Sequence, residues 1–181
     1  MSTRLPWIAL AFLVAALVHM GTLYLVPRIV MARALDELGA VNTMHAGQPN
    51  PFSRSVARMS PDLLYASCPY DLSKGPLRVT AVVPYRAYYW SVSAYDSATD
   101  NFFVRNDQQI AGNSVEIVII KRGQGLPALG NAPERIVLIA PSDRGLILLR
   151  TVIDDEKHEA ALAAALRQSS CGTVASKTGL R

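Results

Sequence analysis

The side chains best suited to bind a ligand or to form a buried polar network are Asp62, Tyr65, Tyr88, Asp96, Asn101 and Arg150. Arg150 lies in the run 146–153, which carries apolar residues on both faces of an extended chain. A guanidinium buried there needs a carboxylate partner, because an unpaired buried charge is very costly. Asp62, Asp71 and Asp96 are the candidate partners. A bridge that fixes the fold and an anion-binding site both remain open.

Aromatic residues are concentrated between positions 85 and 95, at Tyr85, Tyr88, Tyr89, Trp90 and Tyr95. In a strand they would project alternately to two faces, so one row could face the core and the other a cleft. Tyrosines with polar tips commonly line small-molecule sites. They are also ordinary strand residues with large apolar area, and both interpretations stand.

The sequence gives little support for other common kinds of functional site. The three histidines, His19, His45 and His158, show no metal-ligand spacing, so we expect no metal and no cofactor. A glycine-rich stretch from Gly123 resembles a nucleotide-binding fingerprint, but Pro127 lies inside it and prevents a helix from starting there. The enzyme alternative is a hydrolase that uses carboxylates such as Asp62 and Asp96 as acid and base, with an arginine clamping an anion.

The chain has two cysteines, Cys68 and Cys171, with 102 residues between them. They form no Cys-x-x-Cys pair. If the body lies outside the cytoplasm they could form a disulfide, which in the chain-entropy description contributes up to about 4–5 kcal/mol. The alternative is two unrelated thiols, one buried and one in a loose tail, and both remain open.

Residues 5–26 form an uncharged apolar run, and its location determines where the rest of the chain lies. As a helix it would be about 33 Å long, enough to cross a ~30 Å hydrocarbon core. We favour an uncleaved signal anchor over a cleaved signal peptide, because the apolar run exceeds the 7–15 residues typical of the latter. The flanking positive charges, Arg4 on one side and Arg28 and Arg33 on the other, do not decide the orientation. The lipid bilayer is therefore the expected partner of residues 5–26.

Residues 27–38 are predicted to continue as a short helix, in which Pro27 suits either a first turn or a kink. After a loop, the sequence pattern predicts short strands that are separated by turn residues. The predicted strands lie at about 64–67, 77–83, 88–95, 102–105, 115–120, 135–140 and 146–153. This pattern predicts a mainly β fold, an antiparallel β-sandwich or jelly-roll-like domain.

The last predicted element is a helix that Asp154 or Asp155 caps, with a narrow apolar stripe at Leu162, Ala165 and Leu166. From Ser169 onward the composition predicts a frayed tail. The expected organisation is an anchor and juxtamembrane helix at 1–40, a β-domain at 41–155, and a C-terminal helix and tail at 156–181.

Composition excludes several classes. Of the 181 residues, 50% are hydrophobic and 18% are charged, which excludes a disordered tail and a coiled coil. The net charge of +4 is too small to indicate nucleic-acid binding, and we expect no nucleic-acid partner.

Several motifs together resemble the domain of unknown function 1254 family. They are Pro61-Asp62-Leu63-Leu64-Tyr65-Ala66-Ser67, Asp71-Leu72-Ser73-Lys74-Gly75-Pro76, Tyr88-Tyr89-Trp90-Ser91, Asp96-Ser97-Ala98-Thr99-Asp100-Asn101-Phe102, Ala140-Pro141-Ser142-Asp143-Arg144 and Arg150-Thr151. The resemblance covers about residues 42–155. Ser60 and Leu63 depart from the family pattern, which reads Asn and Thr there, whereas Asp62 and Tyr65 match it.

The resemblance implies a β-sandwich-like domain, in a family whose longer envelope or secreted members often carry a companion domain of unknown function 1214. It implies no activity. Taken with the apolar run, it predicts a bacterial inner-membrane protein with one span and its main domain in the periplasm. The expected function is binding, either of a small ligand in a tyrosine-lined cleft or of another envelope protein.

Overall fold

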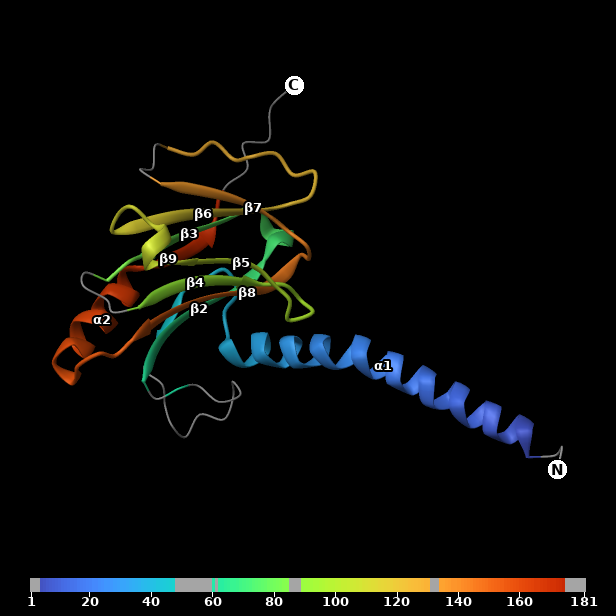
Figure 1. Cartoon of the computed structure of the whole chain (residues 1–181). Helices are drawn as coiled ribbons and strands as arrows, with labels where there is room; N and C mark the ends of the chain where they lie inside the picture. Colours follow the sequence, from blue (N-terminus) through green and yellow to red (C-terminus); the bar gives the residue numbers. More distant parts are fainter. Residues whose placement is uncertain (1–3, 48–59, 61, 85–88, 131–133, 175–181) are drawn as a thin grey trace, which may run out of the picture.

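The computed structural model describes residues 4–47, 60, 62–84, 89–130 and 134–174. It is mostly β, with a long apolar helix at the N-terminus and a shorter helix near the C-terminus (Figure 1). The elements, in chain order, are α1 (Leu5–Leu38), β1 (His45–Gly47), β2 (Leu63–Asp71), η1 (Leu72–Lys74), β3 (Leu77–Val82), β4 (Trp90–Tyr95), β5 (Asn101–Asn106), η2 (Asp107–Gln109), β6 (Ser114–Lys121), β7 (Arg135–Ala140), β8 (Arg144–Val152), α2 (Glu156–Gln168) and β9 (Ser170–Thr173).

The helix α1 is continuous through Pro27, so residues 27–38 extend the apolar helix and do not start a new one. Proline removes one backbone hydrogen bond from a helix interior, and α1 is visibly bent in Figure 1. Next to Pro27, Arg28 Nη1 donates to the Tyr24 carbonyl at 2.7 Å. By length and composition α1 can cross a membrane, with a mean hydropathy of 2.1 over its most apolar window.

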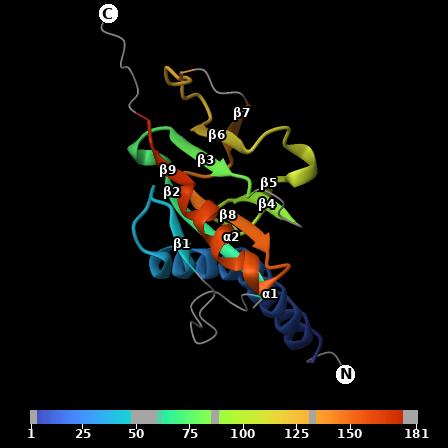
Figure 2. The same ribbon diagram turned by 90° about the vertical axis from the view of Figure 1, so that its left-hand side faces the viewer.

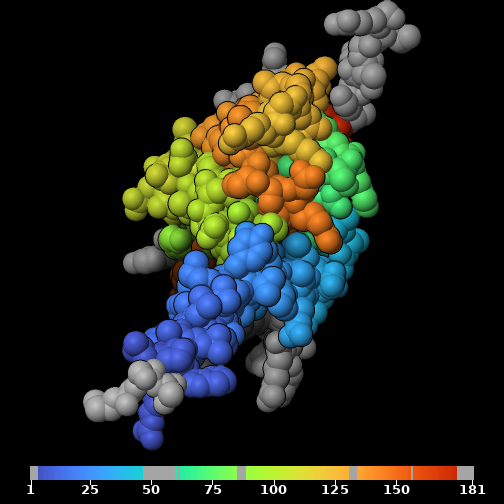
Figure 3. Space-filling view, turned by 90° about the vertical axis from the view of Figure 1, so that its right-hand side faces the viewer, coloured from blue at the N-terminus to red at the C-terminus, as the bar shows by residue number. Residues whose placement is uncertain are grey.

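The two ends of α1 have different surroundings. Its N-terminal part projects clear of the body (Figures 1 and 3), and large apolar side chains there are exposed, among them Trp7 and Phe12. Its C-terminal part packs on β2 and β8, where Met31 and Leu35 form a hydrophobic cluster with Leu146. The helix is therefore docked on the body by its last two turns and is free elsewhere.

The strands form two sheets. The five-stranded sheet has the order β1-β2-β8-β4-β5, and the four-stranded sheet has the order β7-β6-β3-β9. One hydrophobic cluster takes residues from both sheets, including Trp90 and Leu149 from the first and Val79 and Ile117 from the second. In each strand these residues alternate with residues that face away from the cluster, as expected for strands with one buried face.

The expectation of a wholly antiparallel sheet is wrong at one pair, because β6 and β7 are parallel. In the sequence, residues 122–134 separate the end of β6 from the start of β7. A connection of about a dozen residues is long enough for such a crossover.

The frayed tail that the sequence predicted is also wrong in part, because Ser170–Thr173 form strand β9 and pair with β3. A disulfide joins Cys171 of β9 to Cys68 of β2 and so connects the two sheets. Between β8 and β9, α2 lies over one side of the body and contacts β1, β2 and β3 (Figure 2). Its N-cap is Asp155, whose side chain accepts from the Lys157 backbone amide at 3.0 Å.

Candidate functional site

Arg150 lies on β8, the central strand of the five-stranded sheet, between Tyr65 of β2 and Ser91 of β4. Residues directly opposite one another in antiparallel strands project to the same face. The neighbouring positions Leu149 and Val92 belong to the hydrophobic core, so Arg150 and its two partners face away from it. We call Tyr65, Arg150, Ser91 and Ser93 the Arg150 row.

The guanidinium of Arg150 has few partners for its five N–H donors. Its Nη2 donates to Ser93 Oγ at 3.3 Å. Among the residues that the structure describes, neither its buried Nε nor the buried Ser91 Oγ has a hydrogen-bond partner. Because an unsatisfied buried polar group costs about 1–3 kcal/mol, a ligand that accepted these hydrogen bonds would gain free energy here.

The carboxylate partner expected for Arg150 is absent from the described part of the chain, where Arg150 forms no ion pair. The physical reason is its position: the side chain is half-buried on the outer face and keeps contact with solvent. Asp62 is exposed. Asp71 instead caps η1 by accepting from the Ser73 amide at 2.9 Å. The pKa of Asp71 is lowered mainly by a hydrogen bond with the Ser73 side chain, and the Ser73 amide, Arg144 and Lys74 lower it further.

Asp96 has a structural role in the turn between β4 and β5. Its Oδ1 accepts from the backbone amides of Ala98 at 2.7 Å and Asp100 at 3.0 Å. Asp96 follows Ser91 by five residues, so about 16 Å of strand separates it from the Arg150 row. Asn101 starts β5 beside Tyr95 and is exposed. The acid–base convergence that a hydrolase would need therefore does not include Asp96.

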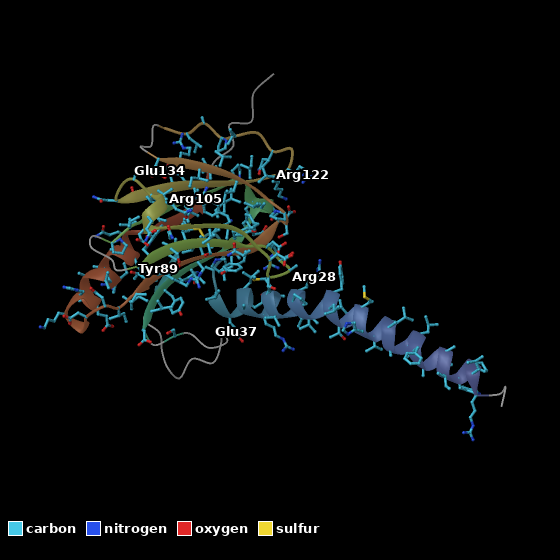
Figure 4. The ribbon with its side chains drawn as sticks, in the orientation of Figure 1. Arg28, Glu37, Tyr89, Arg105, Arg122 and Glu134 are labelled. Carbon is cyan, nitrogen blue, oxygen red and sulfur yellow. A yellow bond between two sulfur atoms is a disulfide. The ribbon has the colours of Figure 1, made fainter. Side chains whose placement is uncertain are left out.

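Two predicted residues lie at the same end of the sheet as Arg150. Tyr65 is its cross-strand neighbour, and the Tyr65 hydroxyl accepts from the Ser60 amide at 3.0 Å. The Asp62 carbonyl accepts from the Ile153 amide at 2.9 Å, which holds the ends of β2 and β8 together. Tyr88 lies outside the described residues. Its neighbour Tyr89, at the start of β4, lies at the opposite end of the body from Arg122 (Figure 4).

A second ionic group was missed by the sequence interpretation. Glu116 on β6 is only 4% exposed and forms ion pairs with Arg78 of β3, at 2.6 Å, and with Arg135 of β7. All acidic and basic members have partners, so this group holds three strands together and offers no vacant charge. The signal was present: Glu116 interrupts the apolar run 115–120 in the same way that Arg150 interrupts 146–153.

In the part of the chain that the structure describes, no group of three His, Cys, Asp or Glu residues is placed to hold a metal ion. The available chemistry is that of an arginine with spare donors beside two serines and a tyrosine. Such a guanidinium is shaped for two parallel hydrogen bonds to a carboxylate or phosphate.

Comparison with known proteins agrees with this lack of a recognisable reaction. A family described as "Protein of unknown function (DUF1254)" matches residues 41–172. No curated protein matches the chain.

Two solved structures are similar to the chain, and the first of them supports the fold. The crystal structure of the VPA0106 protein from Vibrio parahaemolyticus has a TM-score of 0.60 and 11% identity, and the match covers 82% of this chain and 37% of that one. An uncharacterized protein from Burkholderia cenocepacia has a TM-score of 0.48 and 20% identity, over 90% of this chain and 44% of that one. The chain thus spans less than half the length of either protein.

Proposed function

Because the chain belongs to the DUF1254 family, whose description names no activity, we propose a function from its own geometry: a membrane-anchored protein whose β-domain binds an anionic ligand at Arg150. The observation that carries the proposal is the state of the guanidinium. Within the described part of the chain, it has one hydrogen bond, to Ser93, and its buried Nε has no partner. A carboxylate or phosphate group could accept from Nε and a terminal nitrogen together, while Ser91 Oγ supplies a further donor.

The test uses inorganic phosphate and acetate as probes and the full chain in lipid nanodiscs. In ¹⁵N–¹H spectra the Arg150 Nε–H resonance should shift in a saturable manner as phosphate or acetate is added. Arg150→Gln should weaken binding at least about tenfold, the loss of one charge-assisted hydrogen bond. The matched control is Arg105→Gln, since Arg105 is another half-buried strand arginine, with its guanidinium near the Phe103 ring. The proposal fails if the wild type shows no saturable shift, or if both variants bind alike.

We propose that α1 is an uncleaved anchor in a bacterial inner membrane. Its exposed apolar N-terminal part supports this, as does the position of Arg28, whose guanidinium lies 3.7 Å from the centroid of the Tyr24 ring. Tyrosine and arginine at the end of an apolar helix suit the headgroup level. Membrane pellets washed with alkaline carbonate should retain the protein with its original N-terminus. Release into the wash, with a mature chain starting beyond Ala34, would contradict the anchor.

We propose a periplasmic position for the body. Support comes from the disulfide between Cys68 and Cys171, because structural disulfides persist in oxidising compartments and are rare in the cytoplasm. A reporter enzyme that is active only outside the cytoplasm, fused after Arg181, should be active. A fusion active only inside would contradict this orientation.

The same family membership and the shared core support a finer description of the fold. We propose that the two sheets form a sandwich of the jelly-roll-like kind, since residues from both enter one hydrophobic cluster. An experimental structure with the two sheets face to face would test it.

A further inference from the structure

A cavity of about 680 Å³ lies between α2 and the end of β3, and it shares no residue with the Arg150 row. Its apolar wall includes Val82, Val83 and Pro84 on one side and Ala161, Leu162 and Ala165 on the other. The small side chains of α2 leave the space open, because alanine fills little volume. Its size is in the range of natural small-molecule sites, roughly 300–1,000 Å³.

The polar part of this cavity comes from Asp154 and His158. They are four residues apart in the sequence, and His158 Nδ1 lies 3.2 Å from Asp154 Oδ2. The Asp154 side chain is 24% exposed and that of His158 is 62% exposed. The two carboxylate oxygens can accept several hydrogen bonds, so Asp154 retains acceptor capacity beside the histidine.

Charge around the cavity mouth favours a cation. Among the described residues that line the cavity, Asp154 is the acidic one and none is a lysine or arginine. Asp155 is committed to the N-cap of α2. The positive end of the helix dipole offsets only about half a charge. Desolvation works against ionisation of Asp154, but its hydrogen bond and attraction to His158 lower its pKa overall, so it is a carboxylate at neutral pH.

We propose that this cavity binds a small organic cation, with an apolar body against β3 and α2 and an ammonium group at Asp154. This goes beyond the proposed function, because it assigns a second site of opposite charge preference. An apolar wall with one charged group at its edge selects for molecules that combine both features. The predicted order of affinity for one apolar body is ammonium, then alcohol, then carboxylate.

The probes are 1-adamantylammonium, 1-adamantanol and 1-adamantanecarboxylate, which share one compact apolar body. Calorimetric titration of the full chain in nanodiscs, corrected for the heat of empty nanodiscs, should show saturable binding of the ammonium at least fivefold tighter than that of the alcohol. Asp154→Asn should reduce that ratio to about one, because only the ammonium loses an ionic partner.

A matched pair of substitutions tests the location. Ala161 and Ala160 are adjacent, exposed residues of α2, but only Ala161 lines the cavity. Ala161→Phe should fill the mouth and weaken binding of the ammonium at least tenfold, whereas Ala160→Phe should leave it unchanged. Circular dichroism of both variants establishes that each is folded.

Three outcomes would overturn the proposal: no saturable binding of any probe, affinity for the carboxylate equal to that for the ammonium, or equal binding by the two phenylalanine variants. If Ala161→Phe did not fold, Gln168→Phe at the same cavity replaces it, with the same expected loss. Phosphate binding at Arg150 is measured separately, so failure at one site is distinguishable from failure at the other.

Discussion

Gly145, at the start of β8, is the tightest backbone position among the described glycines. A Cβ atom there would lie 2.1 Å from the Tyr95 carbonyl oxygen and 2.5 Å from the Tyr70 hydroxyl. The same Tyr70 hydroxyl donates to the Tyr95 carbonyl at 3.2 Å. Glycine is therefore required here by the close approach of three strands and not by an unusual backbone angle.

Gly145→Ala should lower the free energy of unfolding by about 3 kcal/mol, because one contacting atom belongs to the backbone and the other to the fully buried Tyr70 side chain. Gly125→Ala is the control, since a Cβ there has no heavy atom within 4 Å. Thermal unfolding of the full chain in detergent, followed by Trp90 fluorescence, measures both. Equal transitions would show that the strands can separate to admit a methyl group.

The buried Tyr70 leads to a prediction about the stability of the protein in alkaline solution. Burial raises its pKa above the ordinary value of 10.0, and the charge of Asp96 adds to this, while the Ser142 hydroxyl opposes it. The folded protein thus holds the phenolic proton more firmly than the unfolded chain. The stabilisation is complete below pH 10 and is lost as the pH rises beyond it.

Unfolding measured between pH 9 and pH 11.5 should therefore show a steeper loss of stability for the wild type than for Tyr70→Phe. Tyr89→Phe is the control, because Tyr89 is exposed. If the two variants have the same slope above pH 10, the phenol of Tyr70 ionises freely in the folded protein.

At the scale of elements, the disulfide joins strands that belong to different sheets. Cys68 is fully buried in β2, and Cys171 lies in the short edge strand β9, opposite Val79 of β3. The bond joins two residues that are 103 positions apart in the sequence. It therefore anchors β9 and the end of α2 to the five-stranded sheet.

The double variant Cys68→Ala with Cys171→Ala should unfold with about 2–5 kcal/mol less free energy than the wild type. Reduced wild type should match the double variant, and Cys68→Ala alone should not become less stable on addition of a reductant. Identical unfolding of oxidised and reduced wild type would contradict the expected role of the bond.

The sequence was informative about elements with a strong local pattern. All seven predicted strand regions contain strands, and α2 begins at the predicted cap, because alternation and capping are properties of neighbouring residues. Strands β1 and β9 were missed, since each is short and is defined by pairing with a distant strand. The parallel direction of β7 also depends on pairing alone.

The candidate site could likewise be predicted from the sequence only in part. The apolar surroundings of Arg150 made it conspicuous in the sequence, and Tyr65 is its neighbour in the sheet. Which face Arg150 occupies, and that Ser91 and Ser93 lie beside it, depend on the insertion of β8 between β2 and β4. No local pattern contains that information.

At the scale of the whole molecule, α1 and the body behave as one unit where Met31 and Leu35 pack against Leu146. These two helix residues are 6% and 4% exposed. A docked helix fixes the angle between the body and the axis of the apolar segment, which a flexible linker would not do.

Replacing both Met31 and Leu35 with Ser should release this contact. Spin labels at Arg33 of α1 and Lys74 of the body should give a narrow distance distribution in the wild type and a broad one in the double variant. Val30→Ser is the control, because Val30 is 53% exposed on the same helix. A broad distribution in the wild type would mean that the helix is not docked.

The position of β8 between β2 and β4 has a consequence during synthesis. The chain makes β2, β4 and β5 well before β8, which begins only at Arg144. Until then, the inner edges of β2 and β4 have no hydrogen-bonding neighbour and their apolar faces are uncovered. Such exposed edges invite aggregation. The five-stranded sheet can therefore close only after β8 has been synthesised as far as Val152, and the edges of β2 and β4 stay open until then.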